Sequence, residues 1–403
     1  MASKNILYHP LIPKNLIILI FNLYLIPSIK ANLSFKYPTA FTLNNGNIFV
    51  IHSLGIDICD SNYTTSTNIL TFTQEMTKEK LSKISISKYS TGEILIFIIN
   101  KFYLFNEEGT KLIESVTLNS IYGEYYTLKA HKKEKKHETD YYYFLFAYIN
   151  IYDNSNYNFQ IYYYNIKTSD NEIRETAYKI FSDNVKYTGL SCEFTSYNNK
   201  EYIMCIYEID SYEKFPFFIH FLEIKQVSTP ASIKSVYYSS FDIPEVKCIQ
   251  STIKSIDMKP FFCAVKENGV PFCFMYSLID LYDISSTFSY IYNNGVACIK
   301  QPYNLKTYYF HETSEYIFSC LTEDYKIYTM IFNGNTNNSL EIENLKKVEK
   351  KPGCGEFYYY SIIYSKYYNS YIIISDMDCD SGTKFIPLIE EDSEESIIEE
   401  EEN

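Results

Sequence analysis

Short apolar segments that pair across turn signals recur along the chain at intervals of about 50 residues. The clearest unit runs from Pro244 to Tyr276, where three runs of β-branched and aromatic residues are separated by turns. The second turn contains Asn268 and Gly269, and glycine readily adopts the positive φ that a tight turn between strands requires. Beyond residue 31 no segment has a convincing amphipathic helical pattern. The pattern therefore predicts an all-β chain built from hairpins.

Seven such units fit between residues 32 and 389, with starts near residues 36, 81, 122, 187, 244, 294 and 352. A repeat of about 40 to 50 residues with four short strands is typical of β-propeller blades. A single four-stranded sheet with two apolar faces buries neither face, whereas radial stacking covers both. We therefore predict a β-propeller, most consistent with seven blades. A pair of β-sandwiches or a β-helix is the alternative.

The last unit contains too few strands for a complete blade. After the hairpin that ends near Cys379, only the segment 383–389 precedes the acidic tail. Closing a ring usually takes a blade assembled from both ends of the chain, so we expect the segment after Ala31 to supply the missing strand.

Residues 1–31 have the three-part form of a secretory signal peptide. Lys4 and Lys14 precede the apolar run Leu16–Ile26, and the small Ala31 follows. The run is shorter than the roughly 20 apolar residues of a membrane-spanning helix. An uncleaved anchor or a buried strand is the alternative. A secreted protein or one on the extracellular surface is expected, with no membrane span after signal removal.

Two sequons, at Asn62 and Asn337, would be acceptors for N-linked glycans in a secreted protein. A third, at Asn32, lies too close to the expected cleavage point to count.

The formal charge of −13 lies mostly in residues 390–403, which carry nine acidic residues and no basic ones. A like-charge run of this kind is expected to be disordered. The remainder is nearly balanced, so it lacks the basic stripe that nucleic acids or anionic membranes need. The 43 tyrosines and 28 phenylalanines favour strands, and we attribute their abundance to an AT-rich coding sequence.

Ten cysteines are present, and eight fall into four pairs that each bracket a plausible hairpin. In a secreted chain we expect disulfides within the blades. Cys192 and Cys205 are equidistant from Asn198-Asn199, so a two-residue turn places them opposite one another. The expected pairs are Cys192 with Cys205, Cys248 with Cys263, Cys298 with Cys320, and Cys354 with Cys379.

Cys59 and Cys273 remain, and they either bridge each other or stay as small buried hydrophobic residues. A zinc site is disfavoured because the six histidines are scattered and no Cys-x-x-Cys occurs. Apart from the calcium candidate described next, no cofactor is expected. Asp376, Asp378 and Asp380 resemble the opening of a calcium loop. The match is incomplete, because Gly382 comes one place late and Pro387 stands where a glutamate is needed.

The run from Lys129 to His137 is the one strongly basic patch. We expect an exposed loop between two blade strands there, and its functional alternative is binding of an acidic glycan or acidic protein surface. The lysines of this run are Lys129, Lys132, Lys133, Lys135 and Lys136.

Recognisable enzyme motifs are absent from the sequence: it has no nucleophile elbow, zinc-protease, phosphate-loop or dinucleotide motif. With a single arginine, Arg174, and no tryptophan, it also cannot build a sialidase-type propeller site. We favour an interaction module that binds a protein or glycan. A propeller hydrolase with a carboxylate site at the central channel and a structural surface protein are the alternatives.

Overall fold

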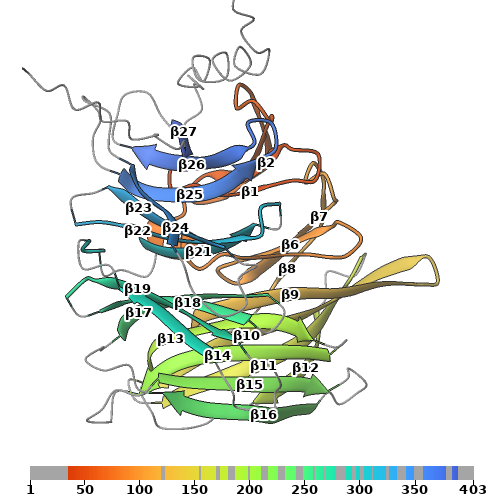
Figure 1. Cartoon of the computed structure of the whole chain (residues 1–403). Helices are drawn as coiled ribbons and strands as arrows, with labels where there is room; N and C mark the ends of the chain where they lie inside the picture. Colours follow the sequence, from red (N-terminus) through yellow and green to blue (C-terminus); the bar gives the residue numbers. More distant parts are fainter. Residues whose placement is uncertain are drawn as a thin grey trace, which may run out of the picture.

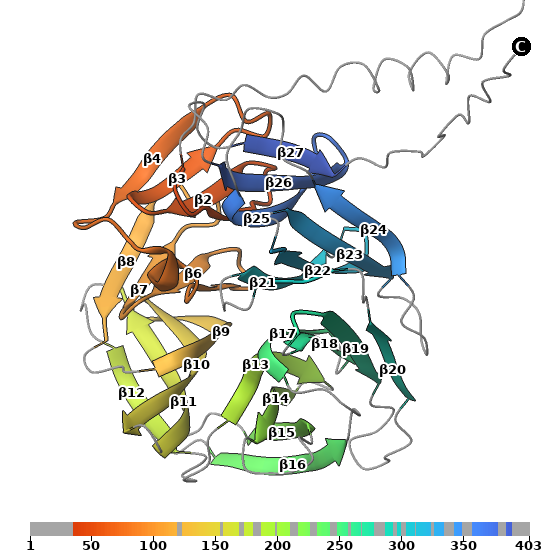
Figure 2. The same cartoon turned by 90° about the vertical axis from the view of Figure 1, so that its left-hand side faces the viewer.

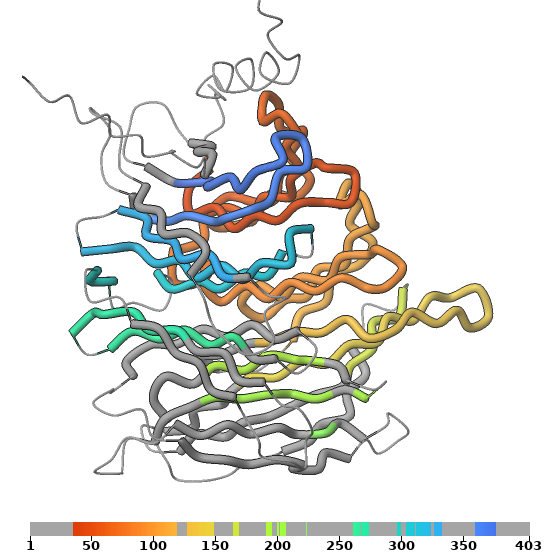
Figure 3. Tube along the Cα trace, in the orientation of Figure 1, coloured from red at the N-terminus to blue at the C-terminus, as the bar shows by residue number. Residues whose placement is uncertain are grey.

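The computed structural model describes residues distributed from Phe35 to Leu388, and Figure 3 traces the chain. The described residues are 35–118, 123–153, 156–168, 173–179, 187–197, 200–209, 217–225, 232–241, 248–256, 259–266, 268–277, 287–292, 296–299, 304–310, 312–323, 326–333, 342–348, 357–377 and 384–388. The predicted signal peptide and acidic tail lie outside them. Within these ranges, no helix is long and apolar enough to cross a membrane.

The described strands form seven antiparallel sheets, six with four strands and the last with three. The first four sheets are β1 (Thr39–Thr42), β2 (Ile48–His52), β3 (Gly55–Cys59), β4 (Ser66–Thr71); β5 (Ser85–Lys88), β6 (Ile94–Ile98), β7 (Lys101–Phe105), β8 (Leu112–Thr117); β9 (Gly123–Lys136), β10 (Thr139–Asp153), β11 (Asn156–Lys167), β12 (Ile173–Lys179); and β13 (Tyr187–Tyr197), β14 (Lys200–Ile209), β15 (Phe217–Lys225), β16 (Ser232–Phe241).

The other three sheets are β17 (Cys248–Ile256), β18 (Lys259–Lys266), β19 (Pro271–Ser277), β20 (Thr287–Tyr292); β21 (Leu305–Phe310), β22 (Glu315–Leu321), β23 (Ile327–Asn333), β24 (Ile342–Val348); and β25 (Phe357–Ser365), β26 (Ser370–Met377), β27 (Lys384–Leu388). One short helix, α2 (Lys78–Leu81), precedes β5 and is capped by the Thr77 side chain.

The sheets are arranged around a central axis, each as a hairpin meander whose first strand lies innermost (Figures 1 and 2). First strands of neighbouring sheets contact one another, as β1 does with β25, β5 with β9 and β13 with β17. The predicted seven-bladed β-propeller is therefore confirmed.

Each hydrophobic core lies between two adjacent sheets, as radial stacking requires. One core joins Phe97 and Phe102 of the second sheet to Phe144 and Phe146 of the third, with ring centroids 4.5 to 5.2 Å apart. Another joins the first and second sheets, where β2 and β6 are buried along their whole length. Continuous apolar runs therefore form strands because both faces of a blade are covered.

The ring closes between β1 and β25 without a shared sheet. Within the described residues, Thr39–Thr42 pairs with β2 in the first sheet, so the prediction that this part of the segment completes the last sheet is wrong. Side chains link the two blades instead. Thr39 Oγ1 lies 3.2 Å from the hydroxyl of Tyr359, and Thr42 Oγ1 donates to the carbonyl of Tyr364 at 2.7 Å. A complete first sheet therefore packs against the three-stranded last one.

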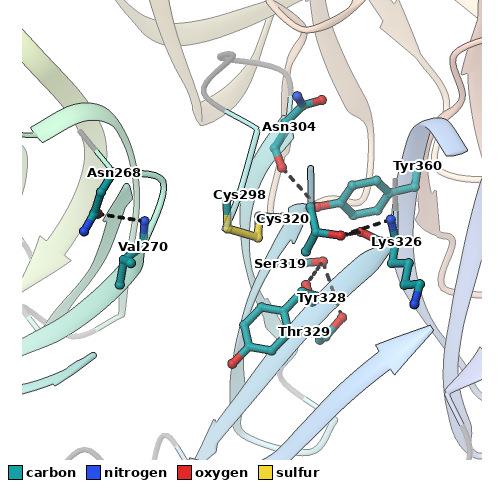
Figure 4. Close-up of a disulfide and its surroundings, with 11 residues drawn as sticks. Asn268, Val270, Cys298, Asn304, Ser319, Cys320, Lys326, Tyr328, Thr329 and Tyr360 are labelled. Atoms are coloured by element: carbon teal, nitrogen blue, oxygen red, sulfur yellow. Dashed lines mark hydrogen bonds between the residues drawn. A yellow bond between two sulfur atoms is a disulfide. The ribbon is translucent and has the colours of Figure 1, made fainter. Parts of the chain in front are cut away.

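Three disulfides are present among the described residues, and two were predicted. Cys192 and Cys205 face each other across β13 and β14, with Cα atoms 4.2 Å apart. Cys298 and Cys320 are joined with a Cα separation of 5.9 Å (Figure 4). Cys298 lies before β21, where its N–H donates to Gly269 O at 2.8 Å, so this bridge fastens the connection between the fifth and sixth sheets.

The predicted bond between Cys248 and Cys263 is wrong. Cys263 pairs with Cys273, directly opposite it on β19, and their Cα atoms are 4.1 Å apart. On β17 the residue opposite Cys263 is Thr252, whereas Cys248 lies opposite Lys266.

A bridge between Cys59 and Cys273 is excluded as well, because Cys273 is bonded to Cys263 and Cys59 is a free, buried thiol. Burial raises the pKa of the Cys59 thiol to about 12. Cys354 and Cys379 lie outside the described residues.

Candidate binding arm

The lysine-rich run forms a strand rather than the predicted loop. β9 and β10 have 14 and 15 residues, against four to six in the strands of the first two sheets, and their hairpin projects beyond the neighbouring sheets (Figure 1). The turn consists of His137 and Glu138, with φ of 48° and 68°. Two consecutive positive φ values are typical of a hairpin turn that matches the strand twist. We call residues 129–143 the arm.

One face of the arm carries lysines from β9 and tyrosines from β10. Lys132 is directly opposite Tyr143, and Glu134 is opposite Tyr141. Directly paired residues share a face of a sheet, and so do residues two apart along a strand. We call this set the Lys–Tyr face; it consists of Lys132, Glu134, Lys136, Tyr141 and Tyr143.

The lysines of this face lie over the tyrosine rings and contact one carboxylate. Lys132 Nζ is 5.1 Å from the centroid of Tyr143, and Lys136 Nζ is 5.6 and 5.7 Å from those of Tyr141 and Tyr143. Both amines contact Glu134, at 2.6 and 3.1 Å, and hold its pKa below the ordinary value. The side chains of Lys132 and Lys136 are 43% and 54% exposed, so both remain accessible from solvent.

The third strand widens this face. Lys167, at the end of β11, is directly opposite Tyr141, and Asn165 is opposite Tyr143. The arm thus presents cationic and aromatic groups on one face of a three-stranded part of the sheet. Ammonium groups attract anionic charges, and tyrosine rings contact apolar groups.

The opposite face anchors the arm to the second sheet. Lys133 Nζ lies 2.7 Å from Glu93 and 3.3 Å from Asp140, and the hydroxyl of Tyr142 donates to Glu93 at 3.3 Å. Burial by itself raises the pKa of Glu93, but hydrogen bonds from Lys133 and Thr91 bring that pKa below its ordinary value. Glu93 is therefore ionised at neutral pH and holds the base of the arm in place.

In every sheet, the turn between the first and second strands lies on the same side of the ring, and in the four-stranded sheets the turn between the third and fourth strands lies on that side too. The arm projects from this side. Three contacts show this arrangement. Asn44 in the β1–β2 turn donates to Glu107 in the β7–β8 turn at 3.0 Å, and Glu93 in the β5–β6 turn forms an ion pair with Lys133. The ring of Tyr63 in the β3–β4 turn stacks on that of Tyr368 in the β25–β26 turn, with centroids 5.6 Å apart. We call this side the arm face.

Asn62, the first predicted glycan acceptor, is exposed in the β3–β4 turn on the arm face. Asn337 lies outside the described residues. Of the calcium candidates, Asp376 is on β26 opposite Tyr359, and Asp378 and Asp380 are outside the described ranges. No group of three or more potential metal ligands occurs in the part of the chain that the structure describes.

A second cluster lies between the first strands of the sixth and seventh sheets. Lys306 Nζ is 3.9 Å from the centroid of Tyr359 and donates to the carbonyl of Tyr360. Burial, together with the charge of Lys78, lowers the pKa of Lys306 to about 7. The cluster offers an amine and phenols rather than the two carboxylates that the hydrolase hypothesis requires.

Sequence reasoning identified the five lysines but missed the tyrosines that complete the surface. Every position from 132 to 136 is charged, so this run lacks the period-two alternation that marks a strand. The density of charge led to a loop prediction instead.

Comparison with known proteins does not assign this chain to a family. No family model matches the chain, and no curated protein matches it. Among solved structures, the WD40 domain of SCAP from fission yeast is 9% identical with a TM-score of 0.45, covering 85% of this chain and 77% of that one. The C-terminal WD40 domain of Sif2 is 9% identical with a TM-score of 0.43, covering 89% and 98%. A mutant of AofleA from Arthrobotrys oligospora is 8% identical with a TM-score of 0.44, covering 80% and 89%.

Proposed function

We propose that the protein is a secreted or cell-surface interaction module whose arm binds an acidic protein or glycan. The observation that carries the proposal is the Lys–Tyr face, where exposed ammonium groups lie over tyrosine rings on a projecting hairpin. Residues 129–140 carry five lysines against three acidic residues, whereas the chain as a whole is acidic. An anionic partner is therefore attracted to the arm more strongly than to the remaining surface.

The disulfides support the location, because such bonds form and persist in oxidising compartments. The signal-like residues 1–31 point to the same compartment. Glycan attachment at Asn62 belongs to the same proposal, since its side chain is exposed in a turn.

Retention on immobilised heparin tests the binding function. The oxidised protein is expected to bind at low salt and to elute as salt screens its charges. The double variant Lys135→Ser/Lys136→Ser should elute at clearly lower salt, while Lys133 is kept because it anchors the arm. The matched control is Lys80→Ser/Lys83→Ser, which removes the same charge from the α2 region, away from the arm face.

Polyglutamate as a soluble competitor separates the two partner classes. Elution of bound protein by polyglutamate at matched charge would favour an acidic polypeptide, and resistance to it would favour a sulfated glycan. The proposal fails if neither immobilised heparin nor immobilised polyglutamate retains the wild-type protein, or if both double variants lose retention equally.

A further inference from the structure

We propose that the acidic C-terminal segment, residues 390–403, docks on the arm of the same molecule. The first support is topological. β27 is antiparallel to β26 and so runs parallel to β25, whose end leads into the turn at Lys366–Asn369 on the arm face. The last described residue, Leu388, therefore leaves the propeller on the side from which the arm projects.

The segment is long enough to reach the arm. From residue 389 to residue 403, 15 residues extend at most roughly 50 Å at about 3.3 to 3.6 Å each. A compact domain of this size has a radius of gyration of about 21 Å. β9 and β10 are the first two strands of their sheet and lie on its axial side, so the path across the ring mouth is shorter than the ring diameter.

Charge complementarity selects the arm as the docking surface. The tail carries nine acidic residues and no basic ones, and the arm is rich in lysine, with Lys167 beside it. Two other lysines of this face have carboxylates nearby, as Lys132 and Lys136 have Glu134. Lys366 Nζ lies 3.8 Å from Glu312, and the charges of Glu312 and Glu107 act on Lys88. The exposed Lys135 and the half-exposed Lys132 and Lys136 are the denser target.

Tethering makes even weak contacts effective. A tether of this length places the tail at an effective concentration on the order of millimolar near the arm. The tail would then occupy the Lys–Tyr face until a partner of higher charge density displaces it. The docking itself does not depend on the proposed binding function, but its role as a built-in competitor rests on that function.

Zero-length carbodiimide cross-linking of the full chain tests the contact directly, because it joins only carboxylates and amines that touch. Peptide mapping at low ionic strength is expected to find tail glutamates joined to Lys132, Lys135 or Lys136 within one molecule. The yield should fall at least fivefold in Lys135→Ser/Lys136→Ser and stay unchanged in Lys80→Ser/Lys83→Ser. Tail cross-links mainly to Lys366 or Lys88, between molecules only, or to no lysine would overturn the proposal.

A full-length variant with the nine tail acids replaced by Gln or Asn provides the second readout. Its elution from heparin should shift to higher salt than that of the wild type. If cross-links form but neither protein binds heparin, the docking stands and the heparin-binding part of the proposed function fails. If both bind heparin identically and no tail–arm cross-links form, the proposed function stands and the docking is wrong.

Discussion

Ser361 and Ala40 are 321 positions apart in the sequence and are joined by two hydrogen bonds. The Ser361 hydroxyl accepts from the N–H of Ala40 at 3.2 Å and donates to the carbonyl of Ala40 at 3.3 Å. Both residues are buried, at 2% and 7% exposure. One side chain of β25 thus satisfies both backbone groups of a β1 residue, at the place where the ring closes.

Replacing Ser361 by Ala should destabilise the protein by about 2 kcal/mol, because it leaves a buried N–H and a buried carbonyl unpaired. Urea unfolding monitored by tyrosine fluorescence measures the loss. Thr42→Val removes a single bond, to the carbonyl of Tyr364, at a partly exposed position and should cost less than half as much. Equal midpoints for Ser361→Ala and wild type would show that ring closure does not depend on this contact.

Deleting residues 32–45 should abolish cooperative thermal unfolding, since the deletion removes β1 and every contact that it makes with β25. Differential scanning calorimetry provides the measurement. A wild-type melting curve after the deletion would argue against closure through these strands.

The stability that Glu93 contributes at the base of the arm should be lost at low pH. The folded-state pKa of Glu93 is below its ordinary value of 4.5, so its contribution to stability is present above that value and is lost as pH falls through the folded pKa. In Glu93→Gln, stability should change less between pH 5 and 3 than in the wild type. Hydrogen exchange of β9 amides should also rise in the variant at neutral pH. The prediction fails if the two proteins have parallel stability profiles.

Lys306 should make stability rise with pH above neutrality. Its folded-state pKa is about 7, against an ordinary value of 10.5, so between these values the unfolded chain binds one proton more than the folded one. The free energy of unfolding therefore increases from pH 7 to 9.5. Lys306→Met should flatten this rise and should be at least as stable as the wild type at pH 7. A variant with an unchanged slope would assign the pH dependence to other groups.

The bond between Cys263 and Cys273 predicts which thiol becomes free when a single cysteine is replaced. In oxidised, denatured Cys273→Ala, Cys263 should become reactive toward a maleimide, and stability should fall by about 2 to 4 kcal/mol. In Cys248→Ala, Cys263 should stay unreactive. Labelling of Cys263 in the second variant would restore the pairing predicted from the sequence.

The cysteine predictions in the fourth and fifth sheets differ in how the turn was used. Cys192 and Cys205 were placed by counting equal distances from Asn198-Asn199, and that pair is confirmed. The same count around Asn268 gives Cys263 and Cys273, five residues to either side. The pair Cys248 and Cys263 came from the repeat spacing and from a hairpin between the two cysteines, without a count from the turn. Spacing does not define register, and a register shift moves a side chain away from its partner.

The sequence by itself determined the architecture, because hairpin turns and continuous apolar strands are local signals and sheets with two apolar faces must stack. The tertiary structure alone decided the ring closure of Ser361 on Ala40 and the lysine–tyrosine pairing across β9 and β10. Ser361 and Ala40 lie in different sheets, so only the packing of the last blade against the first brings them together. The lysine–tyrosine pairs depend on the register between β9 and β10, and a run that is charged at every position has no hydrophobic pattern to fix that register.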